Sequence, residues 1–140
     1  MKVYLAHNFE ARDWLKVTIK PALEAVGHEV TSRWITDDSH LQTFDDDRSA
    51  RADLEDIDKA DVLILFTDQY GSRPPRGKFF EFGYAYADEK ICILLGEDTK
   101  SSVFYRLENV HKYSLLTDVI EFLNLVDMLR RRGTKTYEAV

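Results

Sequence analysis

Two unbroken runs of apolar residues constrain the fold of this chain more than any other feature. They are VLILF, residues 62–66, and ICILL, residues 91–95. Such runs are typical of parallel strands that helices cover on both faces. The segment between them, residues 79–88, is helical by composition. The order of strand, helix and strand therefore predicts a parallel pair joined by a crossover helix.

The rest of the chain continues this alternation. Short apolar stretches predict three further strands, over residues 3–6, 29–34 and 110–113. Helical spacing predicts helices over residues 14–26, 49–60 and 116–129, and a long polar loop over residues 36–47. In the first helix, Trp14 and Val26 belong to the expected apolar stripe, Pro21 is a source of a kink, and Gly27 is a stop signal.

These elements predict one α/β domain over residues 1–140. We expect a doubly wound, mostly parallel five-stranded sheet of the flavodoxin-like or Rossmann-like kind, with helices on both faces. Ligands of such sheets bind beyond the carboxyl ends of the strands, so the loops after Ala6, Thr67 and Leu95 should frame the site.

Charge and composition narrow the class of ligand. The chain has 19 basic and 25 acidic residues, a formal net charge of -6, which disfavours a nucleic-acid polymer and favours a small molecule. Cys92, the only cysteine, lies in an apolar run and is expected to be buried and unpaired. No apolar stretch approaches the roughly 20 residues of a membrane span, and no signal-peptide core is visible. We expect a cytoplasmic protein that does not contact a membrane.

Two carboxylates stand out against their surroundings. Glu81 has phenylalanines at positions 79, 80 and 82, and either it has a chemical role or it complements the helix dipole for about 0.3 to 1 kcal/mol. Asp53 falls with Ala50, Leu54 and Ile57 at the spacing of a core-facing stripe. It either reaches a pocket or is solvated by a small rotation of the helix. Two carboxylates from different helices suit chemistry at an anomeric carbon.

The segments DLEDIDKADVLIL, residues 53–65, and GKFFEFGYAYADEKICIL, residues 77–94, resemble the nucleoside 2-deoxyribosyltransferase family, which includes 2'-deoxynucleoside 5'-phosphate N-hydrolases. The opening MKVYLAHN is also similar to the first strand and active-site loop of that family. The resemblance implies a double displacement in which Glu81 attacks the anomeric carbon and the base leaves. It also implies that Asp53 holds the sugar or assists proton movement, and that Tyr4 orients the Glu81 carboxylate.

The resemblance extends to residues that would hold the substrate. His7 and Asn8 lie in the loop facing the expected pocket, and Gly77 belongs to the turn before Glu81. Ser72, Arg73, Arg76 and Lys78 crowd the same turn and would bind a 5'-phosphate, although a cationic loop is also often just a solvated surface. Members of the family assemble so that a neighbouring subunit completes the pocket, which implies a homodimer or higher oligomer in which Ser101 and Ser102 contact the substrate; otherwise these serines form an ordinary polar turn.

The sequence departs from the family just upstream of Glu81. The transferases carry there an acid that contacts the base, and the hydrolases carry a phosphate-binding serine, whereas this chain has Pro75. Two reactions therefore stay open: transfer of the sugar to a free base, which we slightly favour, and hydrolysis of the N-glycosidic bond of a nucleotide. A non-catalytic nucleotide-binding domain is a further alternative, as is an NAD glycohydrolase of the TIR-like kind. The four histidines show no metal-binding spacing, so neither a metal nor a cofactor is expected.

Overall fold

A computed structural model of the chain describes residues 1–38 and 47–133. These residues form a five-stranded sheet with the strand order β2-β1-β3-β4-β5, in which every neighbouring pair is parallel. The strands are β1 (Lys2–Ala6), β2 (Glu29–Val30), β3 (Val62–Phe66), β4 (Ile91–Leu95) and β5 (Val110–Tyr113). This is the order of flavodoxin-like sheets, and the predicted fold class is confirmed.

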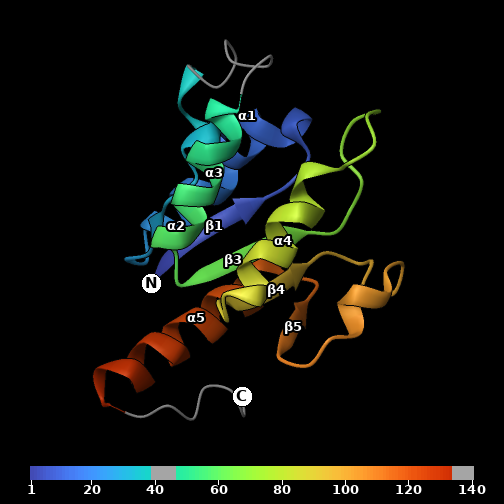
Figure 1. The fold of residues 1–140 in the computed structure, drawn as a ribbon. Helices are drawn as coiled ribbons and strands as arrows, with labels where there is room; N and C mark the ends of the chain where they lie inside the picture. The colour runs from blue at the N-terminus through green and yellow to red at the C-terminus, as the bar shows by residue number, and fades with distance from the viewer. Residues whose placement is uncertain (39–46, 134–140) are drawn as a thin grey trace.

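Helices cover both faces of the sheet (Figure 1). They are α1 (Arg12–Trp14), α2 (Lys20–Glu24), α3 (Arg48–Lys59), α4 (Gly77–Ala87) and α5 (Leu116–Arg131). The connections from β1 to β2 and from β2 to β3 run in opposite directions across the sheet, so right-handed crossovers place them on opposite faces. On one face α3 and α4 pack together. On the other, a 2.9 Å hydrogen bond between His28 and Asn124 ties the end of the first helical segment to α5.

The two apolar runs form the centre of the molecule. All five residues of β3 and all five of β4 are buried, whereas the edge strand β5 is only partly buried. Burying one Val, Leu or Ile side chain contributes about 1.5 to 3 kcal/mol, so these strands dominate the core. The register pairs Ala6 of β1 with Leu65 of β3. The carboxyl ends of the two strands therefore open at the same edge of the sheet.

The second predicted strand is wrong over most of its length. The strand β2 stops at Val30, and Arg33–Ile35 forms a 3-10 turn. Side chains replace the ladder at this point: Ser32 Oγ accepts a 2.7 Å hydrogen bond from Leu5 N, and Trp34 Nε1 donates one of 3.0 Å to Leu5 O. The N–H and C=O groups of Leu5 are therefore hydrogen-bonded by side chains, in place of the backbone of a longer β2 strand.

The first predicted helix is interrupted. A π-helical turn, Leu15–Ile19, separates α1 from α2, and Pro21 lies at the beginning of α2. Proline has no N–H to donate, which breaks the regular hydrogen bonding of the helix at the position where a kink was predicted. Trp14 and Val26 were predicted on the apolar stripe, but they are 37% and 46% exposed.

The remaining elements agree with the predictions to within one or two residues. The predicted loop over residues 36–47 lies mostly outside the described residues. Across residues 1–38 and 47–133, no helix combines the length and the apolar character needed to cross a bilayer.

Candidate active site

A cavity of about 890 Å³ lies beyond the carboxyl end of β1. The start of α3, the turn before α4 and the first turns of α4 form its walls. Eight residues predicted for the site line it, namely Asp53, Glu81, His7, Asn8, Arg73, Arg76, Gly77 and Lys78. The topology therefore brings together side chains separated by up to 74 positions in the chain.

Glu81 and Tyr4 form the centre of the site. Tyr4 points from β1 with a fully buried side chain, and its hydroxyl donates a hydrogen bond to Oε2 of Glu81. Burial raises the pKa of Glu81 to about 8, which the Tyr4 hydrogen bond counteracts and the nearby Asp53 reinforces. Burial and the Glu81 carboxylate also raise the pKa of Tyr4 well above its usual range. Tyr4 is therefore a lasting donor, while Glu81 titrates close to neutral pH.

The stripe on α3 is buried at one end and open at the other. Ile57 is fully buried, Leu54 and Asp53 are half-buried, and Ala50 is exposed. Asp53 and Ala50 both line the cavity. Of the two interpretations of Asp53, the structure favours the one in which the carboxylate reaches a pocket, and its negative charge acts on Tyr4 and on Glu81.

A second carboxylate of α3 was not singled out from the sequence. Asp56 is 1% exposed, and it receives hydrogen bonds from Arg33 Nε at 2.8 Å and from the backbone N–H of Arg33 at 2.9 Å. Asp56 does not line the cavity. Its charge is matched by a cation, so we assign it to the fold.

His7 is buried in an aromatic environment at the cavity. Its ring stacks on Phe66 with 4.9 Å between the centroids, and Nδ1 accepts a 2.7 Å hydrogen bond from Asn8 N. This bond assigns the proton of the neutral ring to Nε2. Burial, followed by the nearby Lys78, lowers the pKa of His7 to about 4. The imidazole is therefore neutral at physiological pH and supplies no charge for a phosphate.

Lys78 secures the helix that carries Glu81. Its ammonium is buried and donates to Asn8 Oδ1 at 3.1 Å and to Phe66 O at 2.8 Å. Burial lowers the pKa of Lys78. Two of the three N–H donors of Lys78 are thus bound within the protein. Arg73 and Arg76, by contrast, are exposed cations of the cavity wall.

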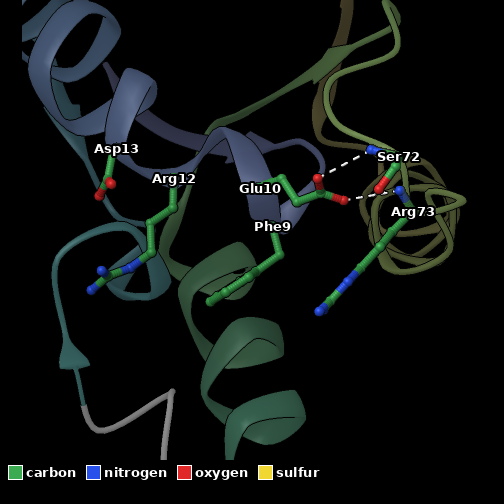
Figure 2. Close-up of a pocket in the computed structure, with 6 residues that line it drawn as sticks. All are labelled: Phe9, Glu10, Arg12, Asp13, Ser72 and Arg73. Atoms are coloured by element: carbon green, nitrogen blue, oxygen red, sulfur yellow. Dashed lines mark hydrogen bonds between the residues drawn. The ribbon is translucent and has the colours of Figure 1, made fainter.

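Ser72 lies beside the main cavity. It lines an adjoining hollow of about 520 Å³ that shares Phe9, Glu10 and Arg73 with the main cavity (Figure 2). The backbone N–H groups of Ser72 and Arg73 both point at the Glu10 carboxylate. The predicted contact of Ser72 with a phosphate would therefore have to come from the rim.

Ser101 and Ser102 lie outside both hollows. The backbone N–H of Ser101 donates to Asp98 Oδ1 at 2.9 Å, and Ser102 Oγ accepts from Phe104 N at 3.2 Å. Within one chain they form a capped turn. Their role in completing a neighbouring cavity requires a second subunit and stays a prediction.

Sequence reasoning missed several residues of the cavity wall, among them Phe9, Glu10 and Trp34. Trp34 was placed in a strand, and the 3-10 turn instead brings its ring within 6.3 Å of that of Phe9. No local pattern marks these positions, because each depends on contacts with distant parts of the chain.

Comparisons with known proteins agree with this geometry. The family model for nucleoside 2-deoxyribosyltransferase matches residues 3–127, a range that includes Tyr4, Asp53 and Glu81. Among solved structures, the chain is similar to a CMP N-glycosidase, BcmB, of Clostridium botulinum, with 25% identity and a TM-score of 0.60. That match covers 89% of this chain and 99% of the other. No curated protein matches the chain. The chain therefore belongs to the nucleoside 2-deoxyribosyltransferase family and is an N-glycosyl transferase or hydrolase.

Proposed function

We propose that this enzyme cleaves the N-glycosidic bond of a nucleoside 5'-monophosphate through a covalent glycosyl ester on Glu81. The observation that carries the proposal is the position of Glu81, which lines the cavity while Tyr4 holds one of its oxygens. A carboxylate on one face of the sugar is the arrangement that a double displacement requires.

The first step follows from the hydrogen bond. Tyr4 engages Oε2 of Glu81, which leaves Oε1 to attack C1' of a sugar bound about 3 to 3.5 Å away. A C1'–O bond forms and the C1'–N bond breaks, with its electron pair going to the base. The departing base takes up one proton from solvent, and Asp53 on the cavity wall is placed to relay that proton. In the second step water attacks C1', the C1'–Oε1 bond breaks to release the Glu81 carboxylate, and the proton lost by the water returns to solvent by the same relay.

Exposed cations support a phosphate on the substrate. Arg73 and Arg76 line the cavity beside Gly77, the first residue of α4. The N-terminus of a helix and arginine side chains both favour a phosphate group. The similar Clostridium botulinum enzyme is, by its name, a CMP N-glycosidase. A nucleotide is therefore a better candidate substrate than an uncharged nucleoside.

Transfer of the sugar to a free base is the second candidate reaction. It rests on the family description, nucleoside 2-deoxyribosyltransferase. Pro75, which lines the cavity, offers no side-chain donor or acceptor with which to hold an incoming base. This favours water as the acceptor.

The substrate is tested by measuring base release by chromatography. Cytidine 5'-monophosphate, its 2'-deoxy form and the corresponding nucleosides are each incubated with the enzyme, with and without free adenine. We expect base release from the monophosphates at rates well above those from the nucleosides, and no adenine nucleotide. Formation of an adenine nucleotide would establish transfer instead, and equal rates on nucleosides would remove the phosphate from the proposal.

The nucleophile is tested by quenching the reaction and measuring the mass of proteolytic peptides. We expect the peptide containing Glu81 to gain the mass of the sugar phosphate. The Glu81→Gln variant should show no such adduct, and Glu121→Gln, which changes an exposed carboxylate of α5, should label normally. A ligand that binds without base release or adduct would favour the non-catalytic alternative.

We also propose that a second copy of the chain completes the cavity through Ser101 and Ser102. Exposed apolar side chains near these serines support this: Val103 is 71% and Phe104 is 63% exposed. Light scattering coupled to gel filtration should give at least twice the monomer mass. A monomer with full activity would contradict it.

A further inference from the structure

A carboxylate from the first loop holds the turn that precedes α4. Glu10 accepts a 3.1 Å hydrogen bond at Oε2 from Ser72 N and a 2.9 Å hydrogen bond at Oε1 from Arg73 N. Figure 2 shows the two oxygens facing the two consecutive N–H groups. Each carboxylate oxygen accepts one hydrogen bond. Along the chain, Glu10 is separated from Ser72 by 62 positions and from Arg73 by 63.

The backbone of the turn is shaped for this close approach. Gly71 has a φ of +79°, a conformation that other residues rarely adopt. A Cβ atom at Gly71 would lie 1.9 Å from Oε2 of Glu10, far inside contact distance. A larger residue at position 71 would therefore displace the Glu10 carboxylate from its two hydrogen bonds.

A second side chain of the same loop holds the other side of Arg73. Asn8 Nδ2 donates a 3.3 Å hydrogen bond to Arg73 O, and Asn8 Oδ1 accepts from Lys78 Nζ. The N–H and the carbonyl group of Arg73 are thus both bound by the loop after β1. The guanidinium of Arg73 extends from this fixed backbone, and the residue lines both hollows.

We infer that Glu10 is a positioning residue for substrate binding, which fixes the backbone of Ser72 and Arg73 so that the Arg73 guanidinium stands in the cavity wall. The inference rests on the proposed function, because Arg73 is there assigned to the 5'-phosphate. It competes with one other interpretation: two converging N–H groups form an anion site, which Glu10 would block.

Three variants separate the hydrogen bonds of Glu10 from its charge. Glu10→Ala and Glu10→Gln both remove the charge, but only the glutamine keeps an acceptor for one N–H group. Gly71→Ala leaves the charge and displaces the carboxylate. Glu121→Gln is the control for removal of an exposed negative charge from another part of the surface.

The variants are made in a Glu81→Gln background, so that ligand binds without turnover, and calorimetry measures the Kd of cytidine 5'-monophosphate and of cytidine. We expect Glu10→Ala to weaken the monophosphate about fivefold, since the bonds are charge-assisted but solvent-exposed. Gly71→Ala should have a similar effect, Glu10→Gln a smaller one, and the Kd of cytidine should change less than about twofold. Unchanged monophosphate binding in Glu10→Ala overturns the inference. Tighter binding overturns it in favour of the blocked anion site.

Amide hydrogen exchange keeps this test separate from that of the proposed function. We expect the amides of Ser72 and Arg73 to exchange faster in Glu10→Ala, while those of β3 keep their rates. If the Glu81→Gln parent binds neither ligand, the proposed function fails, and unchanged exchange at Ser72 and Arg73 then also overturns the positioning role.

Discussion

Asp56 and Glu81 are two carboxylates withdrawn from solvent on the same side of the sheet, and they differ in what they face. Asp56 faces the Arg33 guanidinium and the backbone N–H of Arg33. Glu81 faces a tyrosine hydroxyl and lies near a second carboxylate, Asp53. A buried charge with a cationic partner maintains the fold, whereas one without it titrates at unusual pH and marks a site of chemistry. The partner therefore distinguishes the two roles, and burial does not.

The difference has a thermodynamic consequence. The pKa of Glu81 rises from its ordinary value of 4.5 to about 8 on folding. Between these pH values the folded protein retains a proton that the unfolded chain has lost. The contribution of this group to stability is present below pH 4.5 and is lost as the pH rises through 8. Above about pH 8, where Glu81 is ionised in the folded protein, this group opposes folding.

Replacing Glu81 by glutamine should lower activity strongly and, unlike a change at Asp56, stabilise the fold at alkaline pH. We expect the rate of base release to fall at least about a thousandfold, because the proposed nucleophile is lost. The free energy of unfolding at pH 8.5, measured by denaturant titration, should rise relative to the unmodified enzyme. A loss of stability at that pH would show that the Glu81 charge is compensated in the fold, as the charge of Asp56 is.

Replacing Asp56 by alanine should act in the opposite way. We expect a loss of about 2 to 3 kcal/mol in the free energy of unfolding, less than for a fully buried pair because the Arg33 side chain is 44% exposed. Glu55 also pairs with Arg33, but on the surface, and Glu55→Ala should cost at most about 1 kcal/mol. Equal costs for the two variants would contradict the structural role of Asp56.

Tyr4→Phe tests the hydrogen bond from Tyr4, which favours the charged form of Glu81. The profile of kcat/KM against pH should rise through about pH 8 in the unmodified enzyme, as Glu81 loses its proton. Removing the hydroxyl removes the interaction that lowers this pKa, so the midpoint should move to higher pH. The phenyl ring keeps the core packed, and stability in acid should change little. A midpoint that stays in place would mean that Tyr4 does not act on Glu81.

Asp53→Asn should move the same midpoint by a smaller amount and in the opposite direction. Its negative charge raises the pKa of Glu81, and this influence is weaker than that of the Tyr4 hydrogen bond. The neutral amide should therefore lower the midpoint. The height of the plateau reports separately on proton transfer to the base. A shift to higher pH would contradict the placement of Asp53 as a repulsive neighbour.

The core and the central residues of the site were predictable because their signals are local. Unbroken apolar runs identify β3 and β4, and the unusual aromatic neighbours of Glu81 lie next to it in sequence. Helical spacing likewise pointed at Asp53, since a carboxylate interrupts an apolar stripe there. Strand order then brings these positions to one edge of the sheet.

The remaining features depend on contacts across the chain, which periodicity does not reveal. The partner of Asp56 is 23 positions away, and the turn that contains Trp34 exists because Ser32 and Trp34 bind the backbone of Leu5. Lys78 was predicted to meet a phosphate, because its sequence neighbours are a cationic loop. Its ammonium donates to Phe66 O and Asn8 Oδ1, contacts that periodicity does not reveal, and its contact with a phosphate stays a prediction. Periodicity in the sequence predicts which face of a helix or strand is buried, but not which distant residue that face contacts.

The burial of Tyr4 has a consequence for the proposed glycosyl ester as well as for the free enzyme. The Tyr4 side chain is wholly inside the protein, so in the proposed mechanism its hydroxyl has no solvent partner to replace Glu81 when Oε1 forms the ester. In that proposed ester Oε2 is the carbonyl oxygen, and the hydrogen bond from Tyr4 withdraws electron density from it. We therefore expect Glu81 to be a better leaving group and the sugar adduct to be shorter-lived than without this bond. In the proposed mechanism Tyr4 would thus both orient the attack and speed the release.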